Sequence, residues 1–197
     1  GFMTSAGIPG SSALALFANE GGGVFAPATA IDTGYEVATP YALALDDVTG
    51  DGIPDLVACG GQALSWWAFL RGLGDGSFAP PQSFVSGEYS RWISTADVDA
   101  DGDRDVLITN HGLLTLQVHR NDGGAFPEFL HLDAVDSYRC EVADVDLDGD
   151  LDIVAVAVSV YTYLNDGHGA FTRTSFFGGS GRFRSFLLRD LDGDGRP

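Results

Sequence analysis

The chain has 197 residues, 45% of them hydrophobic, so it is long enough to form one domain, or part of a larger one, around its own core. Its formal net charge is −18, and all ten of its basic residues are arginine. A chain this acidic repels nucleic acid and anionic membranes, which argues against both as partners, and its apolar runs are too short for a membrane-spanning helix.

The acidic residues themselves indicate a cation. Asp accounts for 23 of the 28 acidic residues, whereas an ordinary solvated surface uses Glu as well. Short Asp side chains are typical of loops and of metal ligands. Because mutual repulsion at this charge opposes a compact fold, we expect positive ions to lie among the carboxylates.

Four copies of an acidic loop recur along the chain. Three complete copies occupy residues 47–55, 97–105 and 144–152, and a shorter one begins at residue 190. Their starts are 50, 47 and 46 residues apart. A second motif, a Gly-rich turn that closes on Phe, keeps the same spacing and occupies residues 19–25, 74–78, 121–126 and 165–171. Two motifs with one period indicate a repeat protein.

Short apolar runs between these motifs predict β-strands. Most have four to eight residues, are rich in β-branched and aromatic side chains, and are bounded by Gly, Asp or Asn. In chain order they occupy residues 12–19, 41–45, 55–59, 64–70, 82–85, 106–109, 114–119, 153–158, 160–164, 172–177 and 187–188. No segment keeps a helical period of apolar residues, so we expect an all-β fold.

Four strands per repeat of this length are typical of a β-propeller blade. We name these strands A to D, with the acidic loop between A and B. The chain then begins at strand C of one blade and ends just after strand A of another, which gives three complete blades and two partial ones. The expected division of this single domain, or fragment of one, over residues 1–197 is 1–40 (partial), 41–90, 91–137, 138–183 and 184–197 (partial).

Three ways of completing the ring stay open. The chain closes a ring alone, by pairing its last strand with its first ones; or it is a piece of a larger ring; or several chains complete one ring together. The fourth acidic loop breaks off before its last ligand, which favours the piece of a larger ring.

The spacing of the acidic loop fits calcium, which takes roughly six to eight oxygen ligands in flexible geometry. In the pattern D-x-D-x-D-G-x-x-D the side chains at positions 1, 3 and 5 converge. The Gly at position 6 permits a tight turn, position 7 offers its carbonyl, and the Asp at position 9 completes the set. An EF-hand is excluded because strands flank the loop and Glu is missing at position 12. Mg²⁺ prefers fewer protein ligands, and Zn²⁺ prefers His or Cys.

The candidate ligands follow position by position. The first loop offers Asp47, Thr49, Asp51, the Ile53 carbonyl and Asp55. The second offers Asp97, Asp99, Asp101, the Asp103 carbonyl and Asp105. The third offers Asp144, Asp146, Asp148, the Asp150 carbonyl and Asp152, and the fourth only Asp190, Asp192 and Asp194.

We therefore expect Ca²⁺ at three complete sites and at a fourth, partial one. Thr49 brings no carboxylate, so the first loop is expected to be the weakest of the complete sites. The fourth loop lacks position 9 and is expected to be weak or unfilled unless another chain supplies an oxygen.

These motifs resemble the FG-GAP and VCBS-type repeats, over nearly the whole chain. The resemblance rests on Asp-Val-Asp-x-Asp-Gly-Asp-x-Asp followed by an apolar strand, and on Leu164-Asn-Asp-Gly-His-Gly-Ala-Phe171. Such repeats build the propeller of integrin α-subunits, of many secreted bacterial proteins and of some lectins. The resemblance implies calcium in the loops on one face of a propeller, a ring with more blades than this chain supplies, and a secreted, periplasmic or cell-surface location.

If calcium occupies the A–B loops, partners are expected on the opposite face, which carries the D–A turns. Aromatic and Arg side chains in those turns are the candidates for ligand binding: Tyr41, Tyr89, Arg91, Trp92, Tyr138, Arg139 and Arg184. Aromatic rings stack on sugars or anchor proteins, and Arg binds carboxylates. The alternative is that they cap the central channel or pair with acidic neighbours.

No catalytic motif appears, and the paired carboxylates are explained as calcium ligands, so we expect no enzyme. We expect a calcium-stabilised extracellular binding or adhesion module that recognises a glycan or a protein surface. One alternative is a structural subunit or propeller fragment of a larger surface assembly, including a homo-oligomer that completes the ring. Another is a non-catalytic accessory domain of a secreted enzyme. The resemblance does not choose among these functions.

Overall fold

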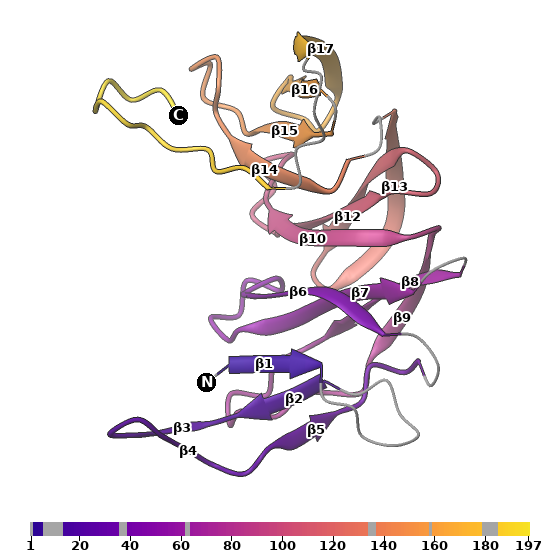
Figure 1. Ribbon diagram of the computed structural model, residues 1–197, viewed down its shortest axis with the longest axis vertical. Coiled ribbons are helices and arrows are strands. Elements are labelled where there is room, and N and C mark those ends of the chain that lie inside the picture. Colours follow the sequence, from indigo (N-terminus) through magenta and orange to yellow (C-terminus); the bar gives the residue numbers. More distant parts are fainter. Residues whose placement is uncertain are drawn as a thin grey trace.

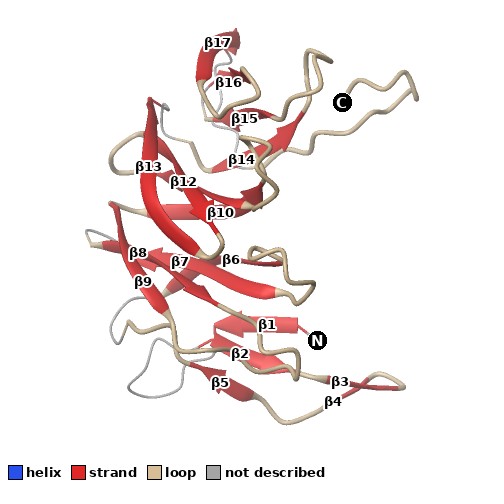
Figure 2. Ribbon diagram, turned by 180° about the vertical axis from the view of Figure 1, so that it is seen from behind, coloured by secondary structure: helices blue, strands red, loops and turns tan. Residues whose placement is uncertain are grey.

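The computed structural model describes residues 2–5, 14–35, 39–61, 64–133, 137–157, 159–178 and 185–197. Regular structure in these residues consists of seventeen strands, with no helix (Figure 2). Within this described part of the chain, therefore, no helix is long and apolar enough to cross a membrane. The expected all-β fold is confirmed.

Three four-stranded antiparallel sheets make up most of the structure, each from four consecutive strands in chain order. The first contains β6 (Pro40–Asp46), β7 (Asp55–Gly61), β8 (Ser65–Leu70) and β9 (Gln82–Gly87). The second contains β10 (Ser90–Ala96), β11 (Asp105–Asn110), β12 (Thr115–Asp122) and β13 (Ala125–Asp133). The third contains β14 (Arg139–Ala143), β15 (Asp152–Val156), β16 (Ser159–Asn165) and β17 (Phe171–Gly178). Each sheet has the order of a propeller blade, with strands A to D in succession.

Three of these strands were not predicted from the sequence. β10 and β14 are the first strands of their sheets, strand A of each blade. Both mix apolar with polar residues, so neither gives a clear apolar run. β13 carries Pro127 and Glu128 and is largely exposed, as an outer strand with one free edge permits.

A smaller sheet precedes the three blades. It has the order β1-β2-β5 and is built from β1 (Phe2–Ser5), β2 (Leu14–Phe17) and β5 (Thr29–Ile31), with a hairpin of β3 (Asn19–Gly21) and β4 (Val24–Phe25) between the last two. The prediction that the chain begins at strand C was wrong, because β1 precedes β2 and pairs with it. Of the predicted strands, residues 12–13 and 158 lie outside the described residues.

The core lies between the sheets. β7, β8, β11 and β15 are buried along their whole length. For β7, β8 and β11 the reason is that a neighbouring sheet covers each face of their sheet, whereas β15 has a neighbouring sheet, the second blade, on one face. Alternate residues then serve two different interfaces: Trp66 packs toward the N-terminal sheet, whereas Trp67 packs toward the second blade with Ile93 and Val106. A third cluster, around Leu107 and Ile153, joins the second blade to the third.

The sheets are stacked along the long axis of the molecule, from the N-terminal sheet at the bottom of Figure 1 to the third blade at the top. Strand A of each blade begins at a D–A turn and ends at an acidic loop. These two kinds of loop therefore lie at opposite edges of the stack, as the alternation of antiparallel strands requires.

Residues 185–197 follow an irregular path beside β14. The predicted strand at residues 187–188 was wrong: the Leu188 N–H donates to the Glu141 side chain (3.2 Å) rather than to a neighbouring strand, and Leu187 is 66% exposed. This segment lies at the end of the stack away from the N-terminal sheet (Figure 1), so the pairing that closes a ring within the chain is not formed by the described residues.

Candidate functional site

The four acidic loops share one backbone conformation. Position 6 is a Gly with positive φ in every loop, as the sequence indicates: Gly52, Gly102, Gly149 and Gly195 at 82°, 101°, 102° and 88°. Position 4 is also left-handed, which the sequence does not reveal, since Gly50, Ala100, Leu147 and Gly193 occupy it at 69°, 58°, 65° and 80°. Ala and Leu carry no signal for a positive φ, because both disfavour it.

The carboxylates at positions 1 and 5 hold the loop together. In the second loop, Asp97 Oδ2 accepts the Gly102 N–H (3.1 Å) and Asp101 Oδ1 accepts the Asp103 N–H (2.9 Å). The equivalent bonds recur in the third loop, from Gly149 to Asp144 (3.0 Å) and from Asp150 to Asp148 (3.0 Å). In each of these carboxylates, one oxygen accepts a backbone N–H, and the second oxygen can bind another partner.

The position 9 carboxylates are fully buried and tie each loop to its own sheet. Asp105 Oδ2 accepts the Val98 N–H (3.0 Å) from the loop, and its Oδ1 accepts the Asn121 N–H (2.9 Å) at the end of strand C. The same two bonds hold Asp55 and Asp152. Burial raises the pKa of Asp105 to about 6. These residues were predicted only as metal ligands, and the structure adds this second, structural role.

Three groups of carboxylates converge closely enough to hold a metal ion. Within each group, one oxygen per residue lies within 4.8 Å of the others: Asp97, Asp99 and Asp101; Asp144, Asp146 and Asp152; Asp190, Asp192 and Asp194. The first two groups contain three buried oxygens, Asp97 Oδ1, Asp99 Oδ1 and Asp144 Oδ1. None of them has a hydrogen-bond donor among the described residues.

Buried anionic oxygens without donors are costly unless a cation compensates them. Burial, followed by the charge of Asp101, raises the pKa of Asp99 above its ordinary value. Burial and the charges of Asp148 and Asp152 likewise raise the pKa of Asp146. The donor set is therefore all oxygen, negatively charged and incompletely satisfied, which fits a hard cation such as calcium.

The fourth group, at the C-terminal end, differs in its environment. All three of its carboxylates are exposed, and Asp190 accepts N–H groups from Gly193 (2.6 Å) and Gly195 (2.8 Å). These backbone bonds lower the pKa of Asp190. The group has the convergent geometry of the others but none of their buried, unsatisfied oxygens.

In the first loop, an Arg side chain compensates the charge of one carboxylate. Thr49 stands at position 3, and Asp51 forms an ion pair with Arg71 (2.9 Å), which lowers the pKa of Asp51. Among the described residues, no group of three metal-binding side chains is found in this loop. The guanidinium of Arg71 thus lies closer to its loop carboxylate than that of Arg120 does in the second loop, where the distance to Asp99 is 3.8 Å.

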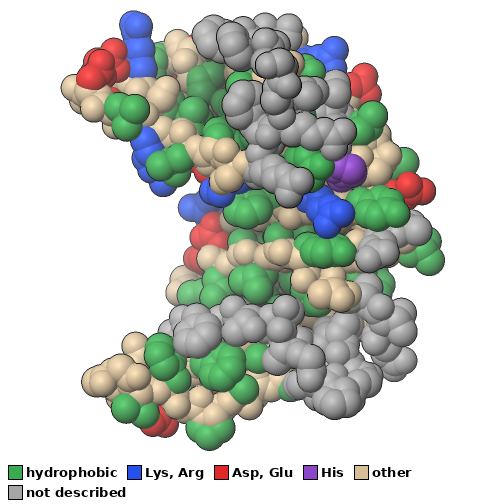
Figure 3. Space-filling model, viewed as in Figure 1, with side chains coloured by type: hydrophobic (Ala, Val, Ile, Leu, Met, Phe, Trp, Pro, Cys, Tyr) green, Lys and Arg blue, Asp and Glu red, His purple; other side chains and the backbone are tan. Residues whose placement is uncertain are grey.

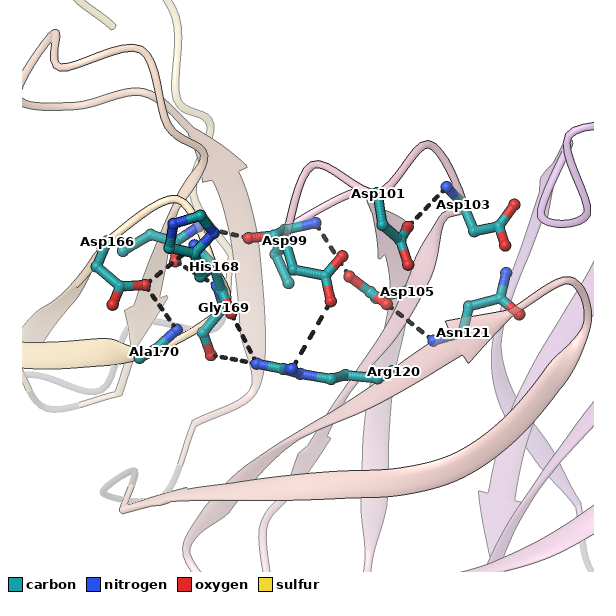
Figure 4. A network of polar contacts seen from close by, with 12 residues as sticks. Asp99, Asp101, Asp103, Asp105, Arg120, Asn121, Asp166, His168, Gly169 and Ala170 are labelled. Carbon is teal, nitrogen blue, oxygen red and sulfur yellow. Dashed lines mark hydrogen bonds and ion pairs between the residues drawn. The ribbon is translucent and has the colours of Figure 1, made fainter.

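The second loop also lies at a junction between two blades (Figure 4). Arg120, from strand β12, reaches Asp99 (3.8 Å) and donates to the carbonyls of His168 (2.8 Å) and Gly169 (3.2 Å) in the third blade. Asn165 donates to the carbonyl of Val98 (2.6 Å), a residue of the second loop.

Asn121 repeats the Asn165 contact one blade earlier, through the carbonyl of Val48 (2.6 Å). Sequence reasoning missed Arg120 and both Asn residues as inter-blade contacts. The available signal was that each Asn opens a Gly-rich turn with the same spacing as the acidic loops.

At the opposite edge, the structure brings six of the seven predicted ligand-binding residues into two neighbouring groups. The guanidinium of Arg91 lies 4.7 Å from the centre of the Tyr41 ring and 5.8 Å from that of Tyr89. That of Arg139 lies 4.3 Å from the centre of the Trp92 ring. Tyr138 bonds the His111 ring through its hydroxyl (2.9 Å). The seventh residue, Arg184, lies outside the described residues.

These groups border a cavity of about 270 Å³, which we name the inner cavity. Its lining residues come from the first two blades and the N-terminal sheet: Leu14, Pro40, Tyr41, Ala42, Leu43 and Trp92. Figure 3 shows Arg and His side chains among hydrophobic ones right of the centre of the view, level with the second blade. The predicted residues thus form one continuous aromatic and basic surface, and Arg139 also pairs with Glu141 (2.7 Å).

Comparison with known proteins agrees with this geometry. The family model described as FG-GAP-like repeat matches the chain twice, at residues 47–108 and 97–155. Each match begins at an acidic loop, and together they span more than half of the chain. No curated protein matches the sequence. The chain belongs to the FG-GAP-like repeat family.

Proposed function

We propose that this protein is a calcium-stabilised binding module that works outside the cytoplasm and is not an enzyme. The observation that carries the calcium proposal is the set of buried carboxylate oxygens without donors at Asp97, Asp99 and Asp144. An ion with several oxygen ligands would satisfy them, and the position 7 carbonyls of Asp103 and Asp150 add neutral oxygens.

The sites are expected to differ in strength. The second and third loops have the most carboxylates and the buried oxygens, so they bind most tightly. The first loop binds more weakly, because Thr49 brings no charge and Arg71 neutralises Asp51. The fourth loop binds weakly as well, because all three of its carboxylates are exposed to water.

Calcium in these loops supports the structure rather than a reaction. Arg120 and Asn165 join the second loop to the following blade, so an ordered second loop holds two sheets together. A bound ion would cancel repulsion among the carboxylates and thereby strengthen that junction. This leaves the opposite edge, with its aromatic and Arg side chains, as the surface for a glycan or protein partner.

Thermal unfolding of metal-stripped protein with and without calcium tests the proposal. A ligand that binds only the folded state stabilises it by about 2.7 kcal/mol per site at a hundredfold excess over Kd. We expect a clear upward shift of the unfolding midpoint with calcium, reduced in Asp99→Asn. Asp122→Asn is the matched control, since this exposed Asp lies at the end of β12, outside the acidic loops. An unchanged midpoint in the wild type would refute calcium stabilisation.

A further inference from the structure

Arg91 is an arginine held by aromatic rings on the edge opposite the acidic loops. Its guanidinium lies over the rings of Tyr41 and Tyr89, but no carboxylate lies within ion-pair distance of it among the described residues. Its Nε is buried and has no hydrogen-bond acceptor in that part of the chain.

Four other arginines, by contrast, pair with acidic side chains. Arg71, Arg104, Arg120 and Arg139 each lie within 4.0 Å of an Asp or Glu oxygen, at 2.9, 3.2, 3.8 and 2.7 Å. With 28 acidic residues to choose from, the fold leaves Arg91 facing aromatic rings instead. A guanidinium held between rings is oriented while its donors stay available, which suits recognition of a planar anion.

The inner cavity lies directly beside this cation. Tyr41, which lies under Arg91, lines the cavity together with Trp92, which lies under Arg139. The indole Nε1–H of Trp92 is buried, so the cavity is bordered by the ring of this residue and not by its N–H. The cavity thus has two aromatic walls and a cation at its rim.

The turn that carries Tyr89 is strained. Tyr89 has a φ of 54°, a left-handed conformation that a bulky side chain rarely adopts. Hydrogen bonds fix it: the Tyr89 carbonyl accepts the His111 N–H (3.0 Å), and the Glu88 carbonyl accepts the Gly112 N–H (3.1 Å). Gly112 is required because a Cβ there would lie 2.7 Å from the Tyr89 ring. The surroundings impose a costly conformation that keeps this ring beside Arg91.

We propose that the inner cavity and Arg91 bind a carboxylate-bearing sugar residue of an acidic glycan. The proposal deepens the binding function proposed above and rests on it. The sugar ring stacks on Tyr41 and Trp92, and the carboxylate accepts the terminal N–H groups of Arg91. A glycan with spaced carboxylates is favoured over an acidic peptide, because a partner dense in charge is repelled by a chain of net charge −18.

The test measures binding of a short oligosaccharide of alternating glucuronate and N-acetylglucosamine to calcium-loaded protein by calorimetry. Its methyl ester, which keeps the rings but has no charge, is the ligand control. We expect saturable binding of the acid, at least tenfold weaker binding of the ester, and a loss of roughly ten- to a hundredfold in affinity in Arg91→Gln. Arg173→Gln is the matched variant, because Arg173 also lies by a Tyr ring (5.8 Å) without a carboxylate partner among the described residues, but on outer strand β17. It should bind like the wild type.

Trp92→Leu tests stacking, since it removes one aromatic wall of the cavity and keeps Arg91. We expect weaker binding with an unchanged calcium shift in thermal unfolding. Equal affinity for the ester and the acid would overturn the role of Arg91, and binding of a poly-glutamate peptide in place of the sugar would overturn the glycan assignment. If neither ligand binds while calcium still raises the midpoint, this inference fails and the calcium proposal stands. If calcium has no effect, the calcium proposal fails whatever the sugar does.

Discussion

The first and second acidic loops have the same backbone conformation, but they differ in the side chains that surround their carboxylates. Both bend through positive φ at positions 4 and 6, and both attach to strand C through a buried position 9 carboxylate. The first loop has Thr49 at position 3 and a close Asp51–Arg71 ion pair (2.9 Å), whereas the second gathers Asp99 with two other carboxylates and holds Arg120 farther away (3.8 Å). The comparison teaches that backbone hydrogen bonds determine the shape of the loop, whereas its side chains determine whether it needs a cation.

The largest expected effect tests the shared part of the two loops. Asp55→Ala and Asp105→Ala each remove the acceptor of two or more buried N–H groups. Both should lower the free energy of unfolding by about 3 kcal/mol or more without calcium. Urea denaturation of metal-stripped protein measures this. A loss confined to Asp105→Ala would contradict a common structural role.

The next effect tests the difference between the loops. Thr49→Asp combined with Arg71→Gln gives the first loop the charge pattern of the second. We expect this variant to be less stable than the wild type without calcium, because the new carboxylates repel. With calcium it should gain about 2.7 kcal/mol beyond the wild type at a hundredfold excess over the Kd of the new site. Thermal unfolding under both conditions is the measurement, and Arg71→Gln alone is the control.

A pH series tests the protonation of the second loop. Without calcium, the folded pKa of Asp105 is about 6, above its ordinary value of 3.8. Protonation of Asp105 contributes to the free energy of unfolding. This contribution is fully present below pH 3.8 and is lost as the pH rises through about 6. Calcium requires the ionised carboxylate, so the stabilisation it provides should grow between about pH 5 and pH 7, by about 1 to 3 kcal/mol. Asp105→Asn should weaken this dependence, and a calcium effect equal at both pH values would contradict it.

The smallest effect concerns position 4. Ala100→Gly and Leu147→Gly relieve a left-handed conformation that costs about 1 kcal/mol for a residue with a Cβ. Each should raise the free energy of unfolding by about that amount. Gly50→Ala is the matched reverse change, since its Cβ would meet only Asp103 Oδ1 at an ordinary 3.7 Å. Destabilisation by the two Gly variants would show that the side chains at position 4 contribute packing.

Much of the fold could be read from the sequence because its determinants are local. Repeated acidic loops, Gly-Phe turns and apolar runs located nearly every middle strand, and position 6 was identifiable because only Gly tolerates its φ. Strand β14 was not predicted, because its burial comes from contact with the neighbouring blade and not from an apolar composition of its own.

The site was predictable only in part, for the same reason. The spacing of Asp97, Asp99 and Asp101 predicts their convergence, which the structure shows. The pairing of Asp51 with Arg71 depends on a residue twenty positions away, and the contact of Arg120 with the third blade joins residues 48 positions apart. No local pattern reports such contacts.

Calorimetric titration of calcium into metal-stripped protein tests the central claim most directly. The account predicts saturable binding, with the tightest sites lost one at a time in Asp99→Asn and Asp146→Asn, and with Asp51→Asn affecting only a weaker phase. Absence of saturable binding at millimolar calcium would contradict it, and the acidic loops would then be turns held by backbone hydrogen bonds alone.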